Sequence, residues 1–469
     1  MRKYNSIALF FVSSLLPLID VSMVIDKTYI YLIFSLVIYL SLVLKGGNAL
    51  ILLSPLNFVY LYCQVSLIIG DYAFSHDLVK HVNLTNEFLN ENSVNRRFVL
   101  ALYEILLFFL TFYFLLNLKV FDSIVVQRVQ LSSCLKRFSS FAQGSKSFIP
   151  FFTIPFVFYS YYLDTFFYSG YISHYFVLYL VVSLIVLVRS KVYYIFIVFV
   201  SLLIMIFTFY GDRREVIYFL YTSLIVYVLF FQKFKLNIFK ISFIALASVL
   251  LILTTTIFRV LFYGTSGEMF VFSDFYELFM NYLDLELFTY FVVVNFDIAN
   301  FYVHGLNSIN AVINDFSLVS YGSTLIKGLF IFIPRSVFPL KPDSMLTIYT
   351  TFVDPNLREL GNSYPINFIA ELFWNFHFLS ILVIFFIGYF LHKLTVSFLY
   401  IFVFKNRKDM ILMLTFVGPF LSYVRGAGIE YIVYSGFIFF GIFLMHSLQD
   451  KVLRKIFYPG VTSVSYVSH

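Results

Sequence analysis

The chain has 469 residues, of which 61% are hydrophobic and only 12% are charged, and its mean hydropathy is +0.90. Soluble globular proteins carry about 25% charged residues, so this composition excludes an ordinary soluble protein and indicates a polytopic membrane protein. The formal net charge is +7, but the sequence contains no recognisable nucleic-acid-binding module, and we expect no nucleic acid as a partner.

Apolar runs of about 20 residues, the length that crosses a bilayer as a helix, set the predicted elements. In chain order, the twelve candidate spans are 6–23, 29–44, 49–70, 98–117, 148–169, 171–188, 192–210, 216–231, 241–262, 378–404, 410–424 and 430–448. The first run lacks the small-residue cleavage site of a signal peptide, so we expect it to be retained as a span. The predicted fold is an all-α polytopic membrane protein, with one membrane domain over residues 1–469.

The distribution of Lys and Arg predicts the orientation of these spans, because cytoplasmic loops are enriched in positive residues. With the N-terminus inside, the inner segments hold more than half of the 32 Lys and Arg residues. Both termini are therefore expected in the cytoplasm, and the long loop 263–365 is expected on the extracytoplasmic side. A semi-apolar stretch at 287–303, interrupted by polar residues, predicts a re-entrant or interfacial helix within this loop.

Arginines on the predicted outer face are informative because positive residues are disfavoured in short outer loops. In the sequence GDRRE, Asp212 and Glu215 have the spacing of a helix capping box, which explains the acids but not Arg213 and Arg214. A guanidinium fork at a helix N-terminus favours phosphate, so Arg213 and Arg214 predict an anion site. A grip on lipid headgroups is the alternative. Arg259, near the outer end of its span, either joins that site or snorkels to the interface.

The segment 333–343, IPRSVFPLKPD, contains three prolines. Prolines stiffen an irregular loop, and this loop presents Arg335 and Lys341. Two cations on a rigid loop beside the outer membrane surface predict a phosphate clamp, with a solvated loop as the alternative.

The segment 361–377, GNSYPINFIAELFWNFH, carries the candidate acid–base groups. On a helix, Asn367, Glu371 and Asn375 fall at i, i+4 and i+8, so they form one polar stripe on an otherwise apolar helix. Glu371 is the acid that we favour as a catalytic or sugar-binding group, and an ion pair with an outer arginine is the alternative.

Trp374, His377 and Arg425 complete the candidates. Trp374 suits the membrane interface or a sugar-stacking site, and His377 is either structural or catalytic. Arg425, in the outer turn YVRGAGIEY at 423–431, either contacts substrate or pairs with Glu430. The acid pair of LDLE is common by chance, and the histidines of HDLVKH have the wrong spacing for one helix face, so no metal is expected.

These features resemble the Wzy-type oligosaccharide repeat-unit polymerases of bacteria, which build O-antigen and capsule. The resemblance rests on the outer Gly211-Asp212-Arg213 element, the loop PRSVFPLKP at 334–342 and the block GNSYPINFIAELFWNF at 361–376. The number of spans and the large late outer loop agree with it. The family's block often continues asparagine–aromatic–glycine, whereas here Asn375 and Phe376 are followed by His377.

The resemblance implies a metal-independent glycosyltransferase with no cofactor, acting on the outer face of the bacterial cytoplasmic membrane in lipopolysaccharide or capsule biosynthesis. Its substrate would be an oligosaccharide on undecaprenyl pyrophosphate, and its partners a chain-length-determining co-polymerase and a flippase. Pyrophosphate would be held by Arg213, Arg214, Arg259, Arg335 and Lys341. Glu371 would be the first candidate base and His377 the second, with Asn375, Trp374 and Arg425 binding substrate.

Three other functions compete with this interpretation. An O-antigen ligase shares the expected architecture and donor lipid. A lipid-linked oligosaccharide flippase would carry charges in a central cavity, whereas the arginines here gather on the predicted outer side. A metal-dependent polyprenyl-phosphate-sugar glycosyltransferase would place acids in its first outer loop, where this chain offers Asp26.

Overall fold

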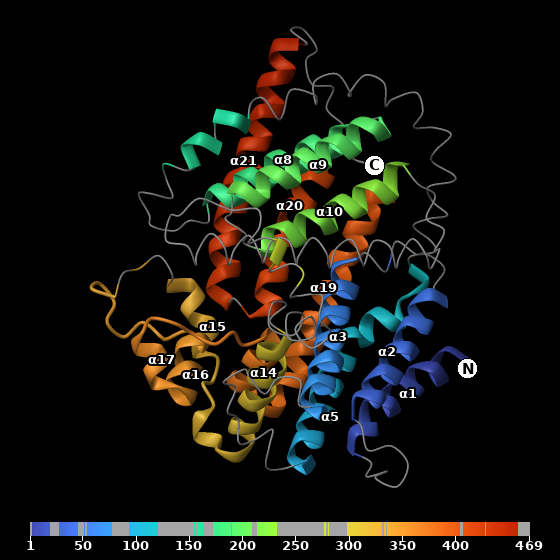
Figure 1. Cartoon of the computed structure of the whole chain (residues 1–469), viewed down its shortest axis with the longest axis vertical. Helices are drawn as coiled ribbons and strands as arrows, with labels where there is room; N and C mark the ends of the chain where they lie inside the picture. Colours follow the sequence, from blue (N-terminus) through green and yellow to red (C-terminus); the bar gives the residue numbers. More distant parts are fainter. Residues whose placement is uncertain are drawn as a thin grey trace, which may run out of the picture. The chain divides into compact units, whose positions relative to one another are not determined.

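A computed structural model describes the chain over residues 2–18, 28–45, 51, 54–76, 93–120, 153–155, 157–160, 162, 172–188, 190–208, 213–231, 276–277, 280, 298–330, 333, 335–403, 407–426 and 428–457. Throughout these ranges the regular secondary structure is helical and no strand occurs (Figure 1). The predicted all-α class is therefore confirmed for this part of the chain.

The helices follow one another with short connections in the C-terminal third. Among the described residues up to 231, the α-helices are α1 (Arg2–Leu15), α2 (Thr28–Lys45), α3 (Pro55–Ser75), α5 (Ser93–Leu116), α8 (Ile172–Leu187), α9 (Lys191–Thr208) and α10 (Arg213–Phe231). The later ones are α14 (Ile298–Asn314), α15 (Ser323–Ile326), α16 (Met345–Val353), α17 (Pro355–Glu359), α18 (Phe368–Phe376), α19 (Ser380–Val403), α20 (Arg407–Arg425) and α21 (Ile429–Phe457).

Three helical stretches in this part of the chain are long and apolar enough to cross a membrane: Pro55–Ser75, Arg96–Leu116 and Phe368–Ile401. They overlap the predicted spans 49–70, 98–117 and 378–404. Helices also occupy the predicted spans 6–23, 29–44, 171–188, 192–210, 216–231, 410–424 and 430–448. Whether these helices cross stays a prediction, as does the topology. The predicted span 241–262 and most of 148–169 lie outside the described residues.

The chain forms two compact units, each described here by itself. The first unit comprises Met1–Ile124, Phe234–Tyr400 and Pro419–Tyr434. The second comprises Val125–Lys233, Ile401–Gly418 and Ser435–His469. In the second unit α10 packs against α8 and α9, and the Tyr194 hydroxyl donates to the Ser223 carbonyl oxygen at 2.5 Å.

Helix α14 is the centre of the first unit. It packs against α3, α5 and α18 (Figure 1), and its side chains Phe301, Leu306, Ile309 and Val312 are buried. Helix α14 contains the last six residues of the stretch 287–303, for which a helix was predicted, and residues 287–297 lie outside the described residues. A re-entrant or interfacial position of this stretch stays a prediction.

Two close approaches bring the helices of this unit together. A Cβ added at Gly70 of α3 would lie 2.5 Å from Tyr302 of α14, so the glycine makes room for the tyrosine ring. A Cβ added at Gly388 of α19 would lie 2.1 Å from the carbonyl oxygen of Leu110 on α5. Small residues that let helix backbones approach are a common device for packing helices in membranes.

The close approach at Gly388 gives the first prediction. Gly388→Ala is expected to lower the unfolding free energy by about 2 kcal/mol, because a backbone atom, and not a flexible side-chain end, blocks the new methyl group. Gly436→Ala is the matched control, since a Cβ there meets nothing within 4 Å. The control is expected to be neutral or to stabilise α21 by up to about 1 kcal/mol. Thermal unfolding in detergent measures both, and equal midpoints would contradict the close contact.

Candidate functional site

The 361–376 block forms a turn followed by a capped helix. Gly361 adopts a φ of +81°, which glycine accepts without strain, and so the chain turns after α17. The Tyr364 amide then donates to Thr350 Oγ1 at 2.9 Å. Asn367 begins α18 as its N-cap, with Oδ1 accepting from the Ala370 amide at 3.0 Å.

Asn367 also joins α18 to two other helices. Its Oδ1 accepts a hydrogen bond from the Tyr103 hydroxyl of α5 at 2.9 Å. Its Nδ2 lies where a Cβ on Gly305 of α14 would come within 2.3 Å. Asn367, the first residue of the predicted polar stripe, therefore holds α18 in place, and other protein groups contact its side-chain amide.

Glu371 and Asn375 lie together, as the stripe predicts, but both are buried. Thr324 of α15 donates its hydroxyl to Glu371 Oε1 at 3.2 Å. Asn375 Nδ2 donates to Thr324 Oγ1 at 2.7 Å and to the Glu371 carbonyl oxygen at 2.8 Å. This set fixes α15 against α18. In this conformation the Glu371 carboxylate is buried, and a substrate hydroxyl could not reach it. The group that we expected to act as a base is instead placed to hold α15 against α18.

Trp374 is fully enclosed, which is contrary to the expected interface or sugar-stacking role. Its indole packs edge-on against Tyr349 at 5.9 Å and Phe352 at 6.0 Å between ring centroids. A sugar needs an open aromatic face to stack on, and this ring offers none. Burial is explained by α16, a helix that the sequence did not reveal, which covers the indole.

His377 ends α18 with an unusual backbone. Its φ of +50° and ψ of −134° lie in a region that residues with a Cβ rarely adopt and that glycine adopts readily. The imidazole is half-buried among the rings of Phe316, Phe373 and Phe378, at centroid distances of 5.3, 5.2 and 4.4 Å. Glycine would adopt this positive φ without the strain that a Cβ causes.

A second polar cluster surrounds His304 of α14. Nδ1 lies 3.1 Å from the Tyr349 hydroxyl, which also accepts from Asn307 Nδ2 at 3.1 Å. The ring stacks on Tyr364 at 4.0 Å, and the Tyr364 hydroxyl donates to Asp354 Oδ2 at 3.2 Å. Burial lowers the pKa of His304 to about 4, so the ring is neutral at physiological pH and a weak proton acceptor. The cluster therefore connects α14, α16 and the GNSYP turn without offering a base.

A third cluster pairs charges from α3 and α5. Asp71 is buried and accepts from the Tyr302 hydroxyl of α14 at 2.6 Å. Arg96 Nε lies 3.8 Å from Asp71 Oδ1. The sequence signal was present, since Arg96 lies on the predicted outer side and Asp71 is an acid in an apolar run. Their pairing could not be predicted from the sequence, because the two residues belong to different helices.

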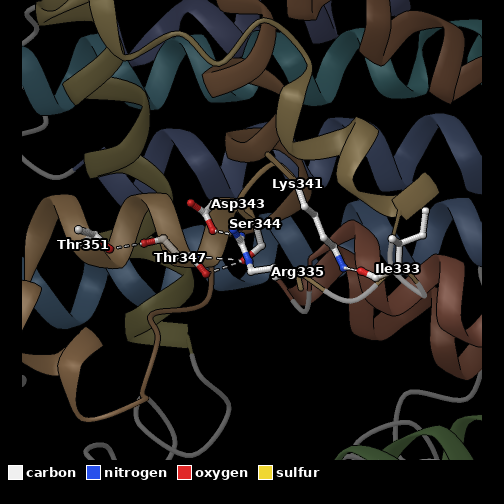
Figure 2. A network of polar contacts seen from close by, with 7 residues as sticks. All are labelled: Ile333, Arg335, Lys341, Asp343, Ser344, Thr347 and Thr351. Atoms are coloured by element: carbon white, nitrogen blue, oxygen red, sulfur yellow. Dashed lines mark hydrogen bonds and ion pairs between the residues drawn. The ribbon is translucent and has the colours of Figure 1, made fainter. Parts of the chain in front are cut away.

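In the predicted phosphate clamp, both cations are bonded to residues of the same loop (Figure 2). Arg335 forms an ion pair with Asp343, and Lys341 Nζ donates to the carbonyl oxygen of Ile333 at 3.1 Å. The loop leads into α16, whose N-cap is Ser344. The two cations therefore stabilise the loop itself, and a phosphate would have to compete with Asp343 for Arg335.

The remaining predicted cations are placed only in part. Helix α10 begins at Arg213, so Arg213 and Arg214 stand in its first turn as predicted. Arg425 is the last residue of α20. The side chains of these three arginines lie outside the described part of the structure, and so does the whole of Arg259.

No family model, no curated protein and no solved structure matches this chain.

The strain at His377 can be tested by two substitutions that remove the same aromatic contacts. Only glycine accepts the positive φ, so His377→Gly is expected to exceed His377→Ala in unfolding free energy. The expected difference is about 1 kcal/mol, because strain relief outweighs the greater chain entropy of glycine. Thermal unfolding of both variants in one detergent measures it. A glycine variant less stable than the alanine variant would rule out the strained backbone.

The Asp71 cluster gives a further prediction. Asp71→Ala is expected to lower the unfolding free energy by about 2 kcal/mol, since Tyr302 loses its acceptor and Arg96 its partner. The full cost of breaking a buried pair is not expected, because Arg96 is partly exposed. Asp71→Asn keeps an acceptor for Tyr302, so about half that loss is expected. Chemical denaturation in detergent micelles reports both values, and identical losses would show that the Tyr302 bond contributes nothing.

Proposed function

We propose that the chain is a polymerase that joins oligosaccharide repeat units carried on undecaprenyl pyrophosphate, on the outer face of a bacterial cytoplasmic membrane. Two findings support it. The helices long and apolar enough to cross a bilayer are those that a membrane-embedded enzyme needs. Two of the three segments that carry the resemblance, 334–342 and 361–376, also belong to the same compact unit, whereas residues 211–213 belong to the other unit.

Helix α16 links these two segments. The 333–343 loop runs directly into its cap at Ser344. Further along α16, Tyr349 contacts Trp374 of the block, and Thr350 accepts from the Tyr364 amide. A cation-bearing loop and the candidate acid–base helix are thus held in one tertiary arrangement, as a shared site requires.

The observation that carries the proposal is the difference between Glu371 and His377. Glu371 is buried and bonded to Thr324, whereas His377 is half-exposed at the end of α18. Strained backbones persist at sites where the conformation serves a function. We therefore place the proton acceptor at His377 and give Glu371 a positioning role through Thr324 and Asn375.

In the proposed reaction, a hydroxyl at the non-reducing end of the acceptor unit attacks the anomeric carbon of the donor chain. The new glycosidic C–O bond forms as the bond from that carbon to the pyrophosphate oxygen breaks. The hydroxyl proton passes to the His377 imidazole, and undecaprenyl pyrophosphate leaves with the bonding electrons. Arg335, available after exchange from Asp343, is the proposed counter-charge within this unit. Arg213, Arg214 and Arg259 stay predictions from the sequence as further pyrophosphate-binding residues.

The test is the surface polysaccharide ladder of a host whose own gene is deleted. The deletion should leave core with a single repeat, and wild type should restore the ladder. His377→Gln should reduce polymer about 100-fold or more, as expected for loss of an acid–base group. Leu379→Ala, two residues further along the chain and 66% exposed, is the control that should restore the ladder. Immunoblots of membranes check that all variants are present.

Other outcomes would reject specific parts of the proposal. A full ladder from membrane-inserted His377→Gln would remove His377 as the proton acceptor. A deletion in which polymer accumulates on the carrier lipid, with none on the core, would identify a ligase. A deletion in which single repeat units stay on the inner face would identify a flippase.

A further inference from the structure

The loop at 333–343 has an apolar tip that its own cations hold in place. Arg335 is tied to Asp343 and Lys341 to Ile333, and each tie spans eight residues of sequence. Figure 2 shows both ties. Because they join residues on either side of 336–340, these five residues form the tip of the loop. Phe338 turns back onto Phe330, with ring centroids 5.1 Å apart.

The aliphatic side chains of the tip face outward. Val337 is 73% exposed and Leu340 is 86% exposed, and Leu329 in the preceding turn is 78% exposed. Ile326, one helical turn before Leu329, is exposed too. Isolated exposed aliphatic residues are ordinary, but several within 15 residues on a braced loop mark an interaction surface.

Three cations lie near the tip in the sequence, Lys327, Arg335 and Lys341, and Asp343 pairs with Arg335. The two lysines therefore supply the net positive charge of this segment. Exposed aliphatic side chains with flanking cations are the composition of segments that settle into the boundary between headgroups and acyl chains of an anionic bilayer. The long stems of lysine and arginine can lie along apolar surface while their charges reach phosphate.

We propose that residues 326–330 and 335–341 form a membrane-surface anchor, in which Leu329, Val337 and Leu340 enter the acyl boundary of an anionic phospholipid leaflet and Lys327 and Lys341 lie at its phosphates. The occupant is lipid because the same chain has helices that are long and apolar enough to cross a bilayer. The few exposed aliphatic side chains of the tip also suit an acyl boundary, whereas a protein partner would need a broader complementary face. The anchor goes beyond the proposed reaction and does not depend on it.

The experiment uses the full chain in nanodiscs and the fluorescence of one added indole. The chain has a single tryptophan, and Trp374 is buried, so wild type supplies the background signal. Leu340→Trp places an indole at the tip. Asn356→Trp, at an exposed polar position of α17, is the control. The discs contain phosphatidylcholine with phosphatidylglycerol, with or without bromine on the acyl chains, and iodide is the aqueous quencher.

Brominated lipid is expected to quench the indole of Leu340→Trp at least about twofold more than that of Asn356→Trp, with iodide giving the reverse order. Quenching of the tip by iodide alone would show a solvated loop and overturn the anchor. Protection from both quenchers would show that protein covers the tip, either a second copy or another segment, and would also overturn it. In discs of phosphatidylcholine alone, weaker bromine quenching is expected, and unchanged quenching would overturn the role given to the lysines.

Discussion

The docking of α14 into the first unit is the constraint on which the rest of that unit depends. Tyr302 fits over Gly70 and bonds to Asp71, His304 bonds to Tyr349, and Gly305 receives Asn367. Contacts of three residues of α14 that are close in sequence thus fix α3, α16 and α18. Polar bonds inside a low-dielectric interior are costly to leave unmade, so they select one register of α14 among many that burial alone would allow.

Much of the fold could be predicted from periodicity and run length. The helices at 55–75, 93–116 and 380–403 lie where apolar runs predict them, because any backbone in lipid must satisfy its hydrogen bonds internally. The boundary near 368 was harder, since the predicted span begins at 378 and the sequence 361–377 was interpreted separately, as a helix with a polar stripe. The long run Phe368–Ile401 shows that the stripe belongs to a helical stretch that is itself apolar enough to cross.

The candidate site was less predictable, because residue type gives chemistry but not burial. Glu371, Asn375 and Trp374 were identified as polar or aromatic groups on a helix, and the packing of α15 and α16 over them decided that they face protein. Those short helices lie among prolines and glycines, where sequence patterns are weak. His377 is different, since the departure from an expected glycine already marked the position where the backbone proves to be left-handed.

The discontinuity of the first unit has a consequence for biogenesis. Asp71 and Arg96 leave the ribosome early, but Tyr302 follows only after the whole 125–233 segment of the second unit has been made. Until then, Asp71 lacks the hydroxyl of Tyr302, and α3 and α5 lack the helix that packs against both of them. The core of the first unit can therefore be completed only after about two thirds of the chain has been synthesised, with α3 and α5 exposing the surface that α14 later covers.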